Sequence, residues 1–279
     1  MTRLDPAEIE RGRNNAAAMR DRSIALAACV LAGLLLALAA VAILSLIARA
    51  PLAAVVGALG RPVVYQALAV SLGTTLVSVV IIVLTGTPLA LLLSRRFPGR
   101  DALEAFVSLP VVLPPVVAGL GLLLAFGRFG LLGRFLSVVG IEVPFTTAAV
   151  VLAQTLVAAP LYVIGAKNAF ERVDPDTLDA AATLRASPVY AALRLVIPPA
   201  APALGAALAL AWARALGEFG ATITFAGNLP GVTQTMPIAV YVAAESDLDA
   251  AIAIALVLIV VSLVVLLASR ALQVRATLQ

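Results

Sequence analysis

The sequence has no histidine, one cysteine and one lysine among its 279 residues. Because histidine is the commonest metal ligand and general base, its absence excludes most metal centres and histidine-dependent hydrolases. Cys29 has no second cysteine to pair with, so no disulfide can form within the chain. The phosphate-binding motif G-x-x-x-x-G-K-[ST] needs a glycine before its lysine, but Ala166 precedes Lys167, so the chain is not a P-loop ATPase. We therefore predict no catalytic residue, no metal and no cofactor.

Charged residues are also scarce, at 12%, whereas hydrophobic residues make up 62% and the mean hydropathy is +1.09. A soluble domain carries about 25% charged residues. The apolar surface of this chain therefore exceeds what a soluble core can hide, and membrane lipid is its natural solvent. The net charge of +4 does not indicate a nucleic-acid partner, because the arginines sit at the ends of apolar runs, as membrane topology requires.

Six apolar runs are long enough to cross a bilayer, which takes about 20 helical residues. The first run is too long to be the core of a signal peptide. The runs cover residues 23–48, 67–93, 103–126, 146–170, 201–225 and 250–269. The sequence thus predicts an all-α integral membrane protein with six transmembrane helices, and a short surface helix over residues 236–244.

The positive charges predict the orientation of these spans. With the N-terminus inside, 14 of the 19 Lys and Arg residues lie on the inner face and four on the outer face, and Arg214 remains within a span. Cytoplasmic loops are enriched in Lys and Arg. We therefore predict a multi-pass protein of the cell (inner) membrane with two cytoplasmic tails, residues 1–22 and 271–279.

A polar segment, residues 171–204, separates the fourth and fifth spans on the predicted inner side. Asp174 and its neighbours supply turn and N-cap chemistry, and residues 177–183 are good helix formers. Ser187-Pro188 then opens a second short helix, and we expect Pro198, Pro199 and Pro202 to end it and to start the next span. Two short helices outside the bilayer are poorly suited to contact lipid and well suited to dock on another protein.

This segment resembles the EAA loop of type I ATP-binding-cassette importer permeases. Asp179-Ala180-Ala181 stands at the Glu-Ala-Ala of the family, Arg185 at its glycine, and Pro198 at the end of its Ile-x-Leu-Pro. Asp179 keeps the charge on a shorter arm, whereas Arg185 replaces a residue suited to a tight turn. The resemblance implies that these five residues couple the chain to a separate ATPase. The alternative is an ordinary cytoplasmic hairpin between two membrane helices.

The fifth predicted span carries two charged residues, Arg214 and Glu218. Their spacing of four places them on one face of the predicted helix. Charged residues at membrane depth usually face protein or a water-filled path. Two interpretations stay open: a neutralised pair that locks the helix to its neighbours, or a cation that lowers the barrier for a passing anion. Because arginine before glutamate is the less favourable order, Glu218 could also have a partner elsewhere.

Three prolines interrupt the third predicted span: Pro110, Pro114 and Pro115. Each removes a backbone donor and opens the helix. The pattern predicts either a static kink or a bent helix that lines a pore, where water can satisfy the freed carbonyls.

A second resemblance narrows the family. Residues 215–225, ALGEFGATITF, and 228–237, NLPGVTQTMP, are similar to molybdate-type permeases, as is the proline-rich run 109–115. Sulfate permeases are similar but tend to carry arginine where Gly217 stands. The resemblance covers residues 66–270, which we take as the type I permease domain. To the translocation path or gate we assign Pro110, Pro114, Pro115, Arg214, Glu218 and Thr222.

The resemblance implies the type I importer fold, a path formed by two copies of the chain, an ATPase dimer inside, and a periplasmic or extracellular oxyanion-binding protein outside. We therefore predict the membrane subunit of an ATP-driven molybdate importer that is not itself an enzyme. A sulfate or tungstate permease of the same family is one alternative. An ion-coupled secondary transporter, with Glu218 as its titratable group, is another, and a non-transporting membrane scaffold is a third.

Overall fold

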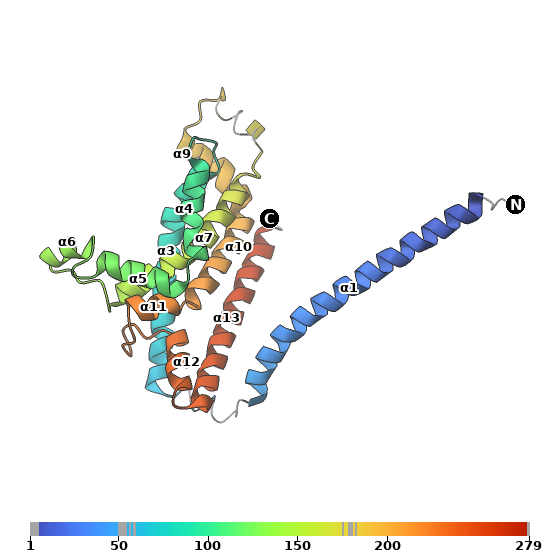
Figure 1. Ribbon diagram of the computed structural model, residues 1–279. Helices are drawn as coiled ribbons and strands as arrows, with labels where there is room; N and C mark the ends of the chain where they lie inside the picture. Colours follow the sequence, from blue (N-terminus) through green and yellow to red (C-terminus); the bar gives the residue numbers. More distant parts are fainter. Residues whose placement is uncertain are drawn as a thin grey trace. The chain divides into compact units, whose positions relative to one another are not determined.

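The computed structural model describes residues 6–49, 55, 57, 60–174, 176–177, 181 and 183–277, and all regular elements in these ranges are helical (Figure 1). The chain divides into two units, residues 1–50 and 51–279. In the first unit the structure describes one helix, α1 (Pro6–Arg49). Its segment Ile24–Arg49 has a mean hydropathy of 2.9 and no buried residue. An unburied helix that is apolar on every side is suited to a bilayer, as predicted for the first span.

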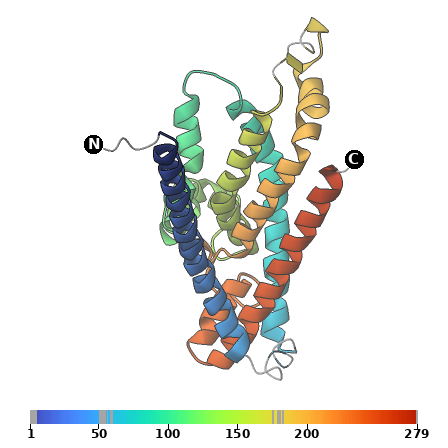
Figure 2. The same cartoon turned by 90° about the vertical axis from the view of Figure 1, so that its right-hand side faces the viewer.

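Long helices run side by side through the second unit (Figures 1 and 2). The central helix, α7, packs against α3 on one side and α10 on another. The core between these three helices is rich in alanine, and a Cβ on Gly165 of α7 would lie 2.6 Å from the Cβ of Ala207 of α10. Small residues let membrane helices approach closely. The long helices and their short neighbour are α3 (Pro62–Leu93), α7 (Thr147–Phe170), α10 (Ile197–Leu216), α13 (Leu248–Thr277) and α12 (Met236–Ala244).

The third span is broken, as its prolines predicted. It consists of α4 (Arg100–Val112) and α5 (Pro115–Phe126), which meet at an angle of 111°. Pro110 lies within α4, and the break falls at Leu113 and Pro114, whose extended backbone leads into α5. Among the described residues, five helices are long and apolar enough to cross a membrane, or six if the bent pair is one span. The predicted all-α, six-span fold class is confirmed.

The fifth span differs from its predicted bounds of 201–225. It begins earlier, because Pro198 and Pro199 lie within a helix that runs without a break from Pro188 to Leu216, with a π-helical turn directly before α10. The prediction that prolines end the preceding helix was wrong. That helix, α9 (Pro188–Ala191), is capped by Ser187 as predicted and continues through a π-helical turn, η1 (Ala192–Val196), directly into α10. The span also ends earlier, at Leu216, and a separate helix α11 (Gly220–Phe225) follows.

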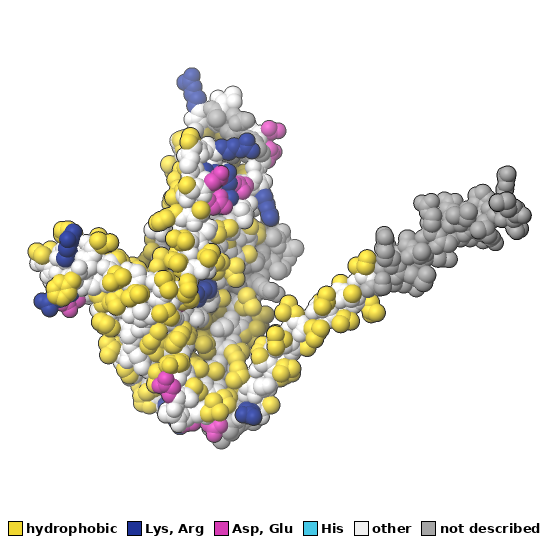
Figure 3. Space-filling model, viewed as in Figure 1, with side chains coloured by type: hydrophobic (Ala, Val, Ile, Leu, Met, Phe, Trp, Pro, Cys, Tyr) yellow, Lys and Arg dark blue, Asp and Glu magenta, His cyan; other side chains and the backbone are white. Residues whose placement is uncertain are grey.

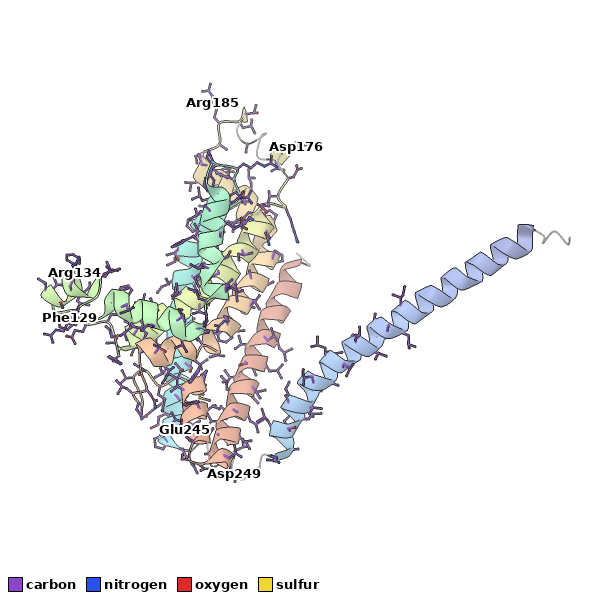
Figure 4. All side chains as sticks on the ribbon, viewed as in Figure 1. Phe129, Arg134, Asp176, Arg185, Glu245 and Asp249 are labelled. Carbon is purple, nitrogen blue, oxygen red and sulfur yellow. The ribbon has the colours of Figure 1, made fainter. Side chains whose placement is uncertain are left out.

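The two ends of the second unit differ in charge. Asp176 and Arg185 lie at one end, here called the α9 end, and Glu245 and Asp249 lie at the opposite end, the α12 end (Figure 4). The face of the bundle seen in Figure 3 is largely apolar, and charged side chains, several of them dark blue cations, gather near α9. This distribution agrees with the charge bias that placed the 171–204 loop inside. The loops and helix ends at the α9 end carry Arg95, Arg96, Arg100, Lys167, Arg172, Arg185 and Arg194.

Arg185 adopts a left-handed backbone conformation, with φ of 57°. The N–H of Ala186 donates to the carbonyl of Ala181, five residues earlier, at 2.9 Å. This is the long hydrogen bond of a Schellman helix end, and it places Arg185 at the position that glycine usually fills. The sequence departed from the family pattern at this residue, and the turn geometry that favours glycine is nevertheless present.

We expect Arg185→Val to loosen this turn, because a β-branched residue fits a positive φ less well than the unbranched arginine does. Arg185→Gly should keep the turn intact. Limited proteolysis of the purified protein should show faster cleavage near residue 185 for the valine variant, by roughly fivefold to tenfold. Leu184→Val is the matched control, since Leu184 is exposed without a positive φ. Equal cleavage rates for all three variants would contradict this account of the turn.

Candidate functional site

The short helices α5 and α11, which follow the ends of α4 and α10, cross and contact each other. A Cβ on Gly119 would lie 2.7 Å from the carbonyl oxygen of Ala221, and a Cβ on Gly220 would lie 2.8 Å from the Cβ of Pro115. Such distances are too short for any side chain, so glycine is required on both helices. The crossing therefore locks α11 against α5 immediately after the bend at Pro114.

Glu218 lies between α10 and α11, and its side chain is 1% exposed. Its Oε1 accepts a hydrogen bond of 2.8 Å from the backbone N–H of Ala221, in the first turn of α11. Its Oε2 lies 2.7 Å from Nη1 of Arg214, without the alignment of a hydrogen bond. The sequence predicted that this pair shares a helix face; in fact Glu218 lies beyond the end of α10. The pair forms nevertheless, and the additional partner anticipated for Glu218 is the Ala221 amide.

Exposure separates the two members of this pair. Glu218 is buried, whereas the side chain of Arg214 keeps 33% of its exposure. One turn further along, Thr222 is fully buried, and its Oγ1 has no hydrogen-bond partner among the described residues. A fixed, buried carboxylate thus holds a cation that other groups can still reach.

Aromatic contacts attach the same region to its neighbours. The rings of Phe126 in α5 and Phe225 in α11 lie 6.1 Å apart, and Phe219 lies 5.1 Å from Tyr241 in α12. A hydrogen bond to Glu245, together with its negative charge, raises the pKa of Tyr241. Of the six predicted path residues, Arg214 and Glu218 form an ion pair, Thr222 lies in α11 next to them in the chain, and Pro115 begins α5, which contacts α11. Pro110 lies within α4 and Pro114 at the bend between α4 and α5.

The predicted coupling residues are only partly covered. Asp179 and Ala180 lie outside the described residues. Ala181 is 7% exposed, Arg185 is exposed, and Pro198 is exposed in the first turn of α10.

Sequence reasoning missed an ion-pair network where α4 begins and α7 ends. Lys167 Nζ donates to both carboxylate oxygens of Glu104, at 2.7 and 2.8 Å, and lies 3.7 Å from Glu171 Oε1. Arg100 Nη2 donates to Glu171, and Arg100 Nε lies 3.9 Å from Glu104. Two pairs spaced by four residues, 100/104 and 167/171, were visible as a signal. The sequence did not show that the two pairs meet, because Glu104 and Lys167 are 63 residues apart in the chain.

A second missed feature is a buried polar face of α3. Ser71, Thr74, Thr75 and Ser78 are all buried, with the spacing of one helix face. The N–H of Met236 donates to Ser71 Oγ at 2.7 Å, and Ser78 Oγ donates to Gln154 Oε1 at 3.1 Å. Their periodic spacing within an apolar run was the available signal.

Comparison with known proteins identifies the class. The family model for binding-protein-dependent transport system inner membrane components matches residues 82–277. The chain belongs to this family: it is a membrane permease subunit of an ATP-binding-cassette importer and not an enzyme in its own right. This confirms the family, the type of function and the multi-pass membrane location predicted from the sequence.

Individual relatives point further. The chain is 46% identical over 203 residues to the molybdenum transport system permease protein ModB of Mycobacterium tuberculosis, covering 72% of this chain and 76% of that one. It is 40% identical over 179 residues to the ModB of Escherichia coli K12, covering 63% and 78%. Over 209 residues it is 35% identical to a probable sulfate transport system permease protein, cysT, of Nephroselmis olivacea, covering 74% of each.

Among solved structures, the chain resembles the inward-facing MetNI methionine transporter. The TM-score is 0.61 at 17% identity, and the match covers 77% of this chain and 96% of that one. This likeness supports the importer fold alone.

Proposed function

We propose that this chain is the permease subunit of an ATP-driven molybdate importer. Two copies would form the translocation path, with an ATPase dimer on the cytoplasmic face and an oxyanion-binding protein outside. The geometry that supports this best is Arg214, a partly exposed cation held by a buried carboxylate beside the crossing of two broken helices. A cation so placed lowers the energy of an anion in a region of low dielectric.

The molybdate assignment rests on similarity. The relatives named for molybdenum transport are 46% and 40% identical to this chain, and the relative named for sulfate transport is 35% identical. Molybdate, tungstate and sulfate are all tetrahedral dianions. The external binding protein would choose among them, and the permease need not bind the ion tightly.

ATP supplies the free energy for transport. The permease adopts two helix packings, and binding of its partners shifts the population from one to the other. The loaded binding protein would dock on the outer segments 127–145 and 226–248. ATP would close the ATPase dimer, draw the 171–204 loops of the two copies together, and open the path outward. Hydrolysis would return it inward. With this loop inside, both termini are cytoplasmic in the inner membrane, as the charge bias favours.

Uptake by the complete transporter in proteoliposomes tests this function. We expect molybdate uptake to require ATP and the binding protein, to stop with vanadate, and to be competed by tungstate more strongly than by sulfate. Proton-driven uptake that is insensitive to vanadate would favour a secondary transporter. Stronger competition by sulfate would identify a sulfate permease.

The assignment of Asp179 to the ATPase interface gives a separate prediction. We expect Asp179→Lys to lower the ATPase activity stimulated by loaded binding protein on the order of tenfold, because reversing a charge at a coupling contact weakens it. Asp174→Lys, earlier in the same loop, is the control. Unchanged stimulation and uptake in the Asp179 variant would remove this residue from the interface.

A further inference from the structure

We propose that the ion-pair network of Arg100, Glu104, Lys167 and Glu171 transmits movement of the 171–204 loop to the broken third span. Lys167 is then a positioning residue for transport. This inference rests on the proposed function, because it assumes that an ATPase moves the loop. Its steps follow from burial, charge and connectivity within the described residues.

Lys167 is the centre of the network. Its side chain is only 9% exposed, and its ammonium group contacts both oxygens of Glu104 and one oxygen of Glu171. Arg100 contacts the same two carboxylates from the start of α4. Two cations therefore face two anions, and the network is neutral. Removing one member of such a group leaves a charge unpaired and partly desolvated, so the four side chains respond together.

α4 depends on this network for its position. From Arg100 to Val112, which the structure describes throughout, α4 has no buried residue, and only Leu103 and Val107 pack partly against the core. The preceding residue, Gly99, has a φ of 88°, so the chain enters α4 through a sharp turn. The strongest polar attachment of α4 to the bundle is thus the pair of carboxylate contacts with α7.

The network lies between the moving loop and the path. Glu171 is the C-cap of α7 and the first residue of the 171–204 loop. At its other end, α4 bends by 111° at Pro114 into α5, which is locked against α11 beside Glu218. A displacement of Glu171 moves Arg100 and Glu104 with it. Since α5 is fixed at its crossing, the bend at Pro114 must absorb the change, and this opens or closes the path.

A different ion pair provides the matched control. Arg61 and Asp247 lie 3.7 Å apart at the α12 end, and their side chains are 60% and 49% exposed. An exposed pair of this kind contributes little, and it connects neither to the loop nor to α4. Its loss should leave coupling unchanged.

The experiment measures molybdate transported per ATP hydrolysed by the complete transporter in proteoliposomes. We expect Lys167→Met to lower this ratio on the order of tenfold while ATPase activity and subunit assembly persist, since the loop still docks but no longer moves α4. Lys167→Arg should keep the ratio near wild type. The neutral double variant Lys167→Met with Glu104→Gln removes one cation and one anion together, so it should assemble at least as well as Lys167→Met while its ratio stays low. Asp247→Asn should have no effect.

An unchanged ratio in Lys167→Met would overturn the proposal. If that variant fails to assemble, the neutral double variant decides: assembly with a low ratio supports the network, and assembly with a wild-type ratio overturns the proposal. Failure of both variants to assemble also overturns it, because it leaves the network a structural role alone. A wild-type transporter that takes up no molybdate, or does so without ATP, would instead refute the proposed function. The two failures are therefore distinguishable.

Discussion

The substitution Gly119→Ala is expected to reduce anion uptake on the order of tenfold or more, because the added methyl group has no space. Its Cβ would lie 2.7 Å from the carbonyl oxygen and 2.8 Å from the Cα of Ala221, both backbone atoms that cannot rotate away. Overpacking of this kind costs about 1–3 kcal/mol. α11 must therefore move away from α5, and the cap from Glu218 moves with it.

Gly121 is the matched control for this prediction. It lies two residues further along α5, and a Cβ there would meet no described atom within 4 Å. Gly121→Ala should therefore leave uptake and thermal stability unchanged, or improve stability slightly through higher helix propensity. Uptake in proteoliposomes and the melting temperature in detergent are the measurements. If both alanine variants behave like wild type, the α5–α11 crossing is not the tight contact that we describe.

The second large effect concerns Arg214 and Glu218. Arg214→Gln leaves the buried carboxylate of Glu218 without its cation, and Glu218→Gln leaves Arg214 without its anion. Breaking a buried pair costs about 3–5 kcal/mol, and the partial exposure of Arg214 reduces this cost. Because the side chain of Glu218 is 1% exposed, we expect Arg214→Gln to destabilise more than Glu218→Gln, in which an amide oxygen can still accept from Ala221.

The double variant separates the two interpretations of this pair. If it serves assembly alone, Arg214→Gln combined with Glu218→Gln should recover both stability and uptake relative to the single variants. If Arg214 attracts the anion, the double variant should recover stability but not uptake. We expect the second result. Loss of assembly in Arg214→Gln before any loss of transport, with uptake restored in the double variant, would leave a structural pair.

The features that were predictable from the sequence are those set by local chemistry. Apolar runs located the spans, and the three prolines located the break in the third span, because a missing donor acts on its own helix turn. Ser187 was correctly placed at a helix start for the same reason. The sequence also excluded a P-loop ATPase, because its one lysine does not follow a glycine as the motif requires.

The features that the sequence did not reveal depend on contacts between distant segments. The fifth span was predicted to run on to residue 225, because Gly217 and Gly220 are tolerated within a long apolar pattern. The need for glycine at position 220 is visible only when α5 lies against α11. Lys167 counted merely as one inner positive charge, because its pairing with Glu104 requires α4 and α7 to be adjacent. Tertiary packing decides both features.

The central claim is that the 171–204 loop faces the cytoplasm and docks on an ATPase. Cys29 is the one cysteine of the chain, so Cys29→Ala gives a cysteine-free background in which Leu184→Cys, at a position 82% exposed, can be labelled alone. A membrane-impermeant thiol reagent should label this cysteine in inverted vesicles but not in intact cells, and bound ATPase should protect it. Labelling from outside the cell, or labelling that the ATPase does not change, would contradict the account.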